Sequence, residues 1–239
     1  ALPSEHGGWG LLLEAVILGM VVRPSWSGAL IGATALFLFL ARHPLKLALQ
    51  DALRGRRAPR TAYCWGLTSG YLMAAVAALS IAVMVRNVTI LIPLGLLAPL
   101  AVTQILYDAH NRSRELLPEL SAAAVMPAFT AAIAIAGGVR IIPAFALGGL
   151  LLARSVPSIL YVRTILRGLP VGPAVVAHVL ALALAALFAP WLAVVAMAIL
   201  LLRALWGLTR PAPPAKTIGW REMIFGAITI GLIAFGHWT

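Results

Sequence analysis

Charged side chains are scarce in this chain, and their scarcity excludes most classes of soluble protein. Only 10% of the 239 residues are Asp, Glu, Lys or Arg, whereas 62% are hydrophobic. A typical soluble domain carries about a quarter charged residues, so this chain has too few to cover a surface exposed to water. The single cysteine, Cys64, also excludes a secreted domain held together by disulfides. The composition therefore indicates an integral membrane protein.

Apolar runs long enough to cross a bilayer recur along the whole chain. We count nine of them, over residues 9–22, 25–41, 62–85, 88–107, 120–138, 141–161, 171–189, 191–209 and 218–237. About 20 apolar residues span the hydrocarbon core as a helix. The runs lack the alternating polarity of membrane-spanning strands. The sequence predicts an all-α membrane protein with nine transmembrane helices in a single domain, residues 1–239.

The basic residues are divided unequally between the connections, which predicts the orientation in the membrane. Thirteen of the 18 lie on the connections that follow even-numbered spans, and only Arg23, Arg86 and Arg140 lie on the others outside the spans. Cytoplasmic loops are enriched in Lys and Arg. We therefore expect the N-terminus in the cytoplasm and the C-terminus outside, in a bacterial cytoplasmic membrane. The net charge of +11 then serves orientation and contact with anionic headgroups, and no nucleic-acid partner is expected.

The acidic residues indicate where polar chemistry takes place. Six of the seven lie on the expected cytoplasmic side, and the seventh, Glu14, lies inside the first span. A carboxylate within a span is costly unless it faces the bundle interior and finds a partner. Arg154, in the sixth span, is the partner expected from its depth. The sequence leaves open whether the two form a structural ion pair or bind a ligand.

The N-terminal segment Pro3-Ser4-Glu5-His6-Gly7-Gly8-Trp9 is the first candidate site. Helix capping explains its serine and its acid, but it does not explain two glycines where a helix would prefer better formers. Paired glycines permit close approach of another helix or of a ligand. Glu5 and His6 are therefore candidate acid–base residues.

Two inner connections supply further candidates. Leucines alternate with charged residues in the segment 44–57, which predicts a short interfacial helix that carries Asp51. After the fourth span, Asp108, Arg112 and Glu115 would share one face if the helix continued, with Arg114 nearby. This second stretch fits either a substrate site, with Asp108 as its catalytic residue, or an ordinary solvated helix face.

A third stripe lies in the sixth span, where Arg154, Ser158 and Tyr161 follow each other at helical spacing. We expect these side chains to bind substrate. No pair of histidines or cysteines has the spacing of metal ligands, so a zinc or haem site has little support.

The N-terminal segment resembles the Pro-x-Glu-His-Gly-x-Trp opening of the YwiC-like bacterial membrane proteins. The stretches from Tyr107 to Arg114 and from Tyr161 to Arg163 fit that family too, so the resemblance covers nearly the whole chain. It implies a polytopic membrane protein and adds topology more than chemistry.

The chain also resembles, more distantly, the UbiA-type intramembrane prenyltransferases. Their layout of nine helices with polar motifs after helices 2 and 4 implies a UbiA-like bundle. In that family, aspartates at positions i and i+4 hold Mg²⁺ on an isoprenoid diphosphate. Here only Asp51 and Asp108 match, and Arg112 replaces the second aspartate of the later motif. Because a guanidinium repels Mg²⁺ and can bind phosphate directly, the resemblance implies a lost or altered metal site.

These observations lead to one functional hypothesis and two alternatives. We expect a polar cavity at the cytoplasmic mouth that binds an anionic amphiphile, an isoprenoid or a lipid, whose tail lies among the helices. If the protein is an enzyme, it is an intramembrane prenyl or lipid transferase, and Mg²⁺ is then a conceivable cofactor. The alternatives are a small-solute transporter and an accessory subunit of a larger membrane complex.

Overall fold

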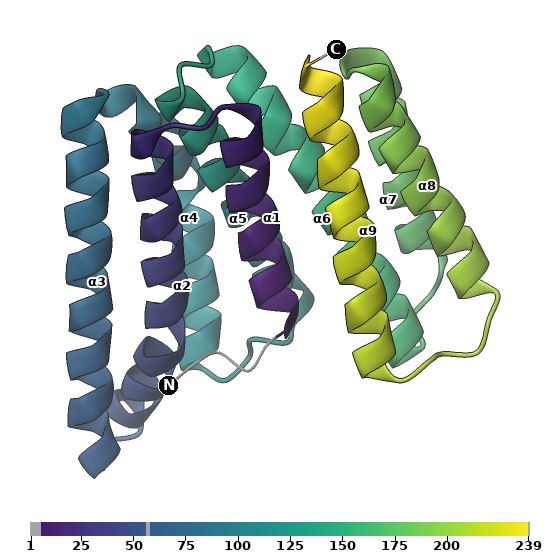
Figure 1. The fold of residues 1–239 in the computed structure, drawn as a ribbon. Helices are drawn as coiled ribbons and strands as arrows, with labels where there is room; N and C mark the ends of the chain where they lie inside the picture. Colours follow the sequence, from purple (N-terminus) through teal and green to yellow (C-terminus); the bar gives the residue numbers. More distant parts are fainter. Residues whose placement is uncertain (1–5, 56–57, 239) are drawn as a thin grey trace.

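The computed structural model describes residues 6–55 and 58–238, and the regular structure in these ranges is helical (Figure 1). The described residues form nine α-helices and one short 3₁₀ helix, η1 (Val88–Ile90). The α-helices are α1 (His6–Val22), α2 (Trp26–Leu53), α3 (Pro59–Val85), α4 (Leu91–Ala109), α5 (Leu116–Ala136), α6 (Ile141–Arg167), α7 (Gly172–Phe188), α8 (Trp191–Leu208) and α9 (Ala215–Trp238).

Each predicted span corresponds to one helix, and the all-α prediction is confirmed. Seven of the helices described are long and apolar enough to cross a membrane, whereas α1 and α7 are apolar but shorter. The chain is thus a multi-pass membrane protein. The exact count of nine spans stays a prediction.

Successive helices run in alternating directions, so the connections gather at two opposite ends of the bundle (Figure 1). The connections after α2, α4, α6 and α8 lie at the same end as the start of α1, and the C-terminal end of α9 lies at the opposite end. The connections predicted to be cytoplasmic therefore share one end of the molecule, which we call the inner end.

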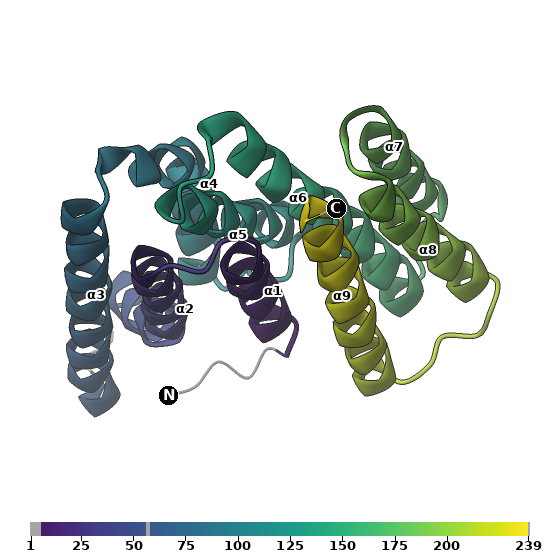
Figure 2. The ribbon, with the colours of Figure 1, turned by 45° about the horizontal axis from the view of Figure 1, so that its top comes forward.

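Helix α5 forms the centre of the bundle and packs against α1, α2, α4 and α6 (Figure 2). Every residue from Pro127 to Ala136 is buried, and half of these residues are alanine. Small side chains let neighbouring helices approach closely, which is how helices associate in a membrane. A β-carbon on Gly148 of α6, for example, would lie 2.9 Å from the carbonyl oxygen of Pro127.

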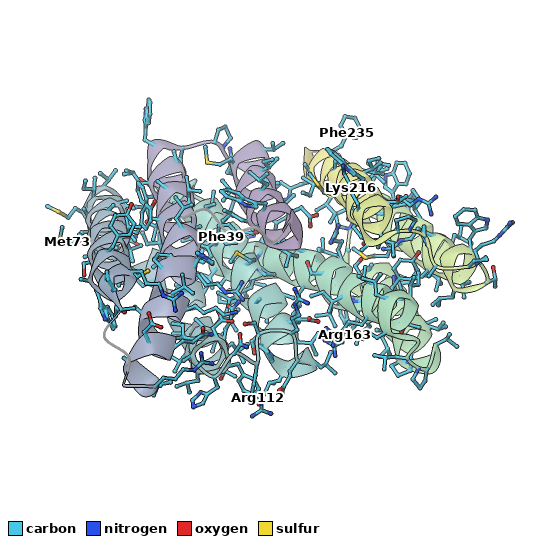
Figure 3. The ribbon with its side chains drawn as sticks, turned by 90° about the horizontal axis from the view of Figure 1, so that it is seen from below. Phe39, Met73, Arg112, Arg163, Lys216 and Phe235 are labelled. Atoms are coloured by element: carbon cyan, nitrogen blue, oxygen red, sulfur yellow. The ribbon has the colours of Figure 1, made fainter. Side chains whose placement is uncertain are left out.

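The outer surfaces of the bundle are apolar. Helix α3 packs mainly against α2, and large side chains such as Met73 and Val76 are exposed on it. Figure 3 shows Met73 pointing away from the bundle, whereas Phe39 of α2 lies among the helices. This distribution fits a surface that faces lipid.

One expectation about the inner end is wrong. The segment 44–57 does not begin a separate interfacial helix, because α2 continues without interruption through Pro44 to Leu53. A proline removes one backbone donor, and a packed membrane helix can absorb that loss through its neighbours. At about 1.5 Å per residue, the 28 residues of α2 extend for about 42 Å, beyond the roughly 30 Å hydrocarbon core.

Candidate functional site

A cavity of about 320 Å³ lies among helices α1 to α5. Its walls are almost entirely apolar, and its length follows one face of α2 and one face of α4. The face of α4 is formed by Leu94, Leu97, Ala98, Ala101, Gln104, Ile105 and Asp108. From Leu94 to Asp108 the helix rises about 21 Å, so the cavity is a long, narrow slot.

The inner end of the slot is polar. It is lined by Arg42 and Lys46 of α2 and by Gln104 and Asp108 of α4. Arg42 Nε lies 2.7 Å from Asp108 Oδ2, and Arg42 Nη2 donates to Asp108 Oδ1 at 3.2 Å. The Gln104 amide, with its oxygen turned toward Arg42, accepts from the guanidinium at 3.2 Å. Asp108 is 3% exposed, so this bidentate pair is shielded on the carboxylate side.

Lys46 supplies a positive charge that this pair does not neutralise. Its ammonium group donates to Ser113 Oγ at 2.6 Å. Within the described ranges, no carboxylate lies within 4.0 Å of it. Among the described residues that line the polar end, the charges of Arg42 and Asp108 cancel, so the Lys46 ammonium remains as a positive charge. Such an end attracts an anion.

The N-terminal part of α1 closes one side of the slot. A β-carbon on Gly8 would lie 3.0 Å from Cε2 of Phe39, and the rings of Trp9 and Phe39 meet edge to face with centroids 4.8 Å apart. The prediction of close helix approach at the paired glycines is confirmed for Gly8, whereas a β-carbon on Gly7 would meet nothing within 4 Å. Glu5 lies outside the described residues, and for His6 only the backbone is described.

The predicted shared face of Asp108, Arg112 and Glu115 is wrong. Helix α4 ends at Ala109, and Asn111 adopts a left-handed conformation with φ of 60°, which turns the chain away. Arg112 Nε instead pairs with Glu115 Oε1 at 2.5 Å on an exposed turn. Figure 3 shows Arg112 at the edge of the molecule. The turn therefore separates this exposed pair from Asp108, which is buried against α2.

Other candidates of the inner connections hold helix ends together. Asp51, 2% exposed, accepts from Arg60 Nη2 at 2.8 Å and from Thr61 Oγ1 at 2.9 Å, which ties the end of α2 to the start of α3. The backbone carbonyl of Arg114 accepts from Arg163 and Arg167 of α6. Glu119 pairs with the same two arginines. These contacts fix the α4–α5 connection beneath α6.

Glu14 and Arg154 are paired, as their depth in the sequence predicted. Arg154 Nη2 lies 2.8 Å from Glu14 Oε1 and also donates to the backbone carbonyl of Glu222 at 2.9 Å. Both side chains are less than a tenth exposed. The pair therefore links α1, α6 and α9 deep in the bundle.

A second buried ion pair adjoins the first. Arg203 of α8 lies 3.1 Å from Glu222 of α9 and donates to Ser158 Oγ at 3.0 Å. Its guanidinium also stands over the Tyr161 ring, 4.1 Å from the centroid. The expected stripe of Arg154, Ser158 and Tyr161 thus faces one cluster, which we call the four-charge cluster: Glu14, Arg154, Arg203 and Glu222. Its formal charges cancel.

Glycines make room for this cluster. A β-carbon on Gly226 of α9 would overlap Glu14 Oε1 and lie 2.6 Å from Arg154 Nη2. A β-carbon on Gly207 of α8 would overlap the Tyr161 hydroxyl. Seven of the eight buried polar side-chain atoms without a hydrogen-bond partner in the described residues belong to the cluster or to Ser155 and His178 of the adjacent helices. The packing there is tight, and the polar groups are only partly satisfied.

The residues that the sequence suggested for one site therefore lie apart. Asp108 lines the slot, and Glu14, Arg154, Ser158 and Tyr161 lie in or beside the four-charge cluster. Asp51, Arg112, Arg114 and Glu115 belong to neither. The slot lies among α1–α5, and the four-charge cluster lies among α1, α6, α8 and α9. Sequence reasoning did not select Arg42, Lys46, Arg203 or Glu222 as site residues. The position of Arg203 inside an apolar span was a usable signal, because an unpaired charge there is costly.

The donors at the polar end of the slot do not fit Mg²⁺. Asp108 is the one carboxylate among the described residues that line it, and Arg42 already binds both of its oxygens. Mg²⁺ needs several oxygen ligands. Elsewhere in the described residues, no group of three His, Cys, Asp or Glu side chains is placed to hold a metal ion.

The N-terminal part of the chain matches a known protein family. The model of the YwiC-like protein family matches residues 2–135, more than half of the chain. The chain belongs to the YwiC-like family. The match runs through all of α1–α4 and nearly all of α5, so it includes every residue that lines the slot of this YwiC-like protein. Neither a curated protein nor a solved structure matches the chain.

Proposed function

We propose that this YwiC-like protein binds a membrane amphiphile that has one long apolar tail and an anionic head. The tail lies in the slot among α1–α5, and Lys46 binds the head at the inner end. The observation that carries the proposal is the slot itself, a long apolar channel whose inner end is lined by the Lys46 ammonium. The setting we propose is a bacterial cytoplasmic membrane, with the inner end toward the cytoplasm and all nine helices in a UbiA-like bundle.

The shape of the slot supports a single extended tail. Its face on α2 runs from Thr34 to Leu49, about 22 Å of helix, and nearly matches the 21 Å on α4. The apolar part beyond the polar end runs on α4 from Leu94 to Gln104, about 15 Å, so a tail that fills it would extend through about one leaflet of hydrocarbon. An isoprenoid chain meets this requirement. The volume of about 320 Å³ falls at the small end of ligand pockets, which favours one chain over two.

The polar end supports recognition of phosphate. Lys46 is a flexible point charge, and its ammonium bonds only to a serine hydroxyl among the described groups. Arg42 is bonded to Asp108 and Gln104, and these contacts form the polar wall beside the Lys46 ammonium. A phosphate or diphosphate head accepts hydrogen bonds from such an ammonium. The proposal concerns binding, since Asp108 is engaged with Arg42 and is not free to hold a metal.

Binding of farnesyl diphosphate to the purified full chain tests the proposal, with dimethylallyl diphosphate as the short-tailed probe and farnesol as the probe without charge. Ala101→Trp places a large ring in the middle of the slot, and Val102→Trp places the same ring on the exposed face one residue along. We expect the first variant to lose at least tenfold in affinity for farnesyl diphosphate, whereas the second keeps it.

The head is tested by Lys46→Gln. This change should weaken farnesyl diphosphate binding about tenfold and leave farnesol binding unchanged, because only the charged head contacts the ammonium. Equal effects of the two tryptophan variants would exclude the slot as the tail site. Failure of the native chain to bind either long-tailed compound would overturn the proposal as a whole.

A further inference from the structure

The connection between α8 and α9 brings three cations and two tryptophans together at the inner end. Trp206 lies near the end of α8, and Arg210 follows it in the linker. Arg221 of α9 approaches the same ring from across the connection. The guanidinium carbons of Arg210 and Arg221 lie 5.4 Å and 5.9 Å from the Trp206 centroid. The two guanidinium groups therefore contact the same indole ring and lie less than 12 Å apart.

We name this group the α8–α9 basic patch: Trp206, Arg210, Lys216, Trp220 and Arg221. All five side chains are exposed, the two tryptophans by 55% and 58%. The linker between the helices contains Pro211, Pro213 and Pro214, which lack backbone N–H groups and restrict the chain. The patch therefore lies on two helix ends that are joined by a conformationally restricted linker.

The cations of the patch lack acidic partners. In the part of the chain that the structure describes, Arg210, Lys216 and Arg221 form no ion pair with a carboxylate. At the neighbouring inner connections the opposite holds, because Arg163 and Arg167 share Glu119. Glu222, the nearest acid in the sequence, pairs with buried Arg203 instead. Figure 3 shows Lys216 on α9, well apart from Arg112 and Arg163.

From this arrangement we infer that the α8–α9 basic patch binds the headgroup of an anionic phospholipid. Three cations that form no ion pair in the described residues, Arg210 of the linker and Lys216 and Arg221 in the first two turns of α9, attract a phosphate. Guanidinium groups bind phosphate oxygens in pairs. Exposed tryptophans at the end of a span are amphipathic and lie at the headgroup level. Basic groups between helices on the cytoplasmic side are known to hold such headgroups. A free phosphate ion would use the cations but not the apolar rings.

The test is lipid binding to the full chain in detergent, measured by native mass spectrometry with phosphatidylglycerol and phosphatidylcholine. The double variant Arg210→Gln/Arg221→Gln removes two charges from the patch. Arg54→Gln/Arg140→Gln removes two exposed charges that are likewise unpaired in the described residues but lie elsewhere. We expect the patch variant to lose about tenfold in affinity for phosphatidylglycerol, and the control variant to change less than twofold.

Three results would overturn the inference. An equal loss in both double variants would show that total charge matters and that the patch does not. Equal binding of phosphatidylcholine would show that the anionic headgroup is not selected. Displacement of the lipid by inorganic phosphate would assign the patch to a free anion. The thermal midpoints of all variants are measured in parallel, and since the changed side chains are exposed, we expect these midpoints to match that of the native chain.

Discussion

Gly226 offers the sharpest test of the four-charge cluster. An alanine there would introduce a β-carbon that overlaps Glu14 Oε1 and lies 2.6 Å from Arg154 Nη2. Both atoms end flexible side chains, but the side chains are 8% and 5% exposed, so neither can move into solvent. The substitution therefore forces the ion pair apart inside the bundle.

The cost can be worked from the two effects involved. Breaking a buried ion pair costs about 3–5 kcal/mol, because it leaves charges without compensation. Replacing glycine by alanine within a helix returns about 0.5–1 kcal/mol. The net destabilisation is about 2–4 kcal/mol. For a chain of this size, each kcal/mol lowers the unfolding midpoint by about 2–4 °C, so we expect a drop of about 4–16 °C.

Cys64 provides the assay. It is the only cysteine in the chain, and it is buried in α3. A maleimide dye that fluoresces on reaction with a thiol reports global unfolding of the detergent-solubilised protein. Gly231→Ala is the matched control, because a β-carbon at Gly231 of the same helix would meet nothing within 4 Å. We expect that variant to keep or slightly raise the midpoint.

A double variant separates the steric effect from any general effect on α9. In a Glu14→Ala background, the overlapping oxygen is absent, so Gly226→Ala should cost markedly less than it does alone. Equal midpoints for Gly226→Ala and Gly231→Ala in the native background would refute the reasoning. So would an unchanged cost of Gly226→Ala when Glu14 is removed.

Two further predictions use the same assay. Arg42→Ala leaves the buried Asp108 carboxylate without its guanidinium and should cost about 3–5 kcal/mol, whereas Arg112→Ala breaks an exposed pair and should leave the midpoint almost unchanged. Similar midpoints for these two variants would contradict the burial of Asp108 and the exposure of the Arg112–Glu115 pair. Gly207→Ala should lower the midpoint because its β-carbon overlaps the Tyr161 hydroxyl, and Tyr161→Phe should restore part of the loss. If Tyr161→Phe did not raise the midpoint of the Gly207→Ala variant, the strain would not arise at the Tyr161 hydroxyl.

The sequence predicts the helices well because lipid imposes a simple rule. Each span must be helical and about 20 residues long, and the charges must lie between spans. The same rule predicted the Glu14–Arg154 pair, since a buried acid needs a base at the same depth. The paired glycines likewise predicted a close contact, which Gly8 makes with Phe39.

The contacts that define the slot could not be predicted in the same way. Helix α4 ends at Ala109, and the turn at Asn111, a single residue with φ of 60°, separates Arg112 from Asp108. Helical spacing alone favoured the opposite arrangement. Similarly, Pro44 looked like the start of a new element, because its effect on the helix depends on neighbours that the local sequence does not specify.

The position of α1 has a consequence for communication between distant parts of the molecule. This helix lines the slot at Gly8 and joins the four-charge cluster at Glu14, six residues and about 9 Å further along. Because a helix is stiff over this length, a displacement of α1 at the slot would also move Glu14. If a tail in the slot shifts α1, the strength of the ion pair with α6 changes, and by thermodynamic reciprocity the state of that ion pair alters the affinity of the slot. Helix α1 is therefore the element through which a tail bound in the slot would act on the four-charge cluster.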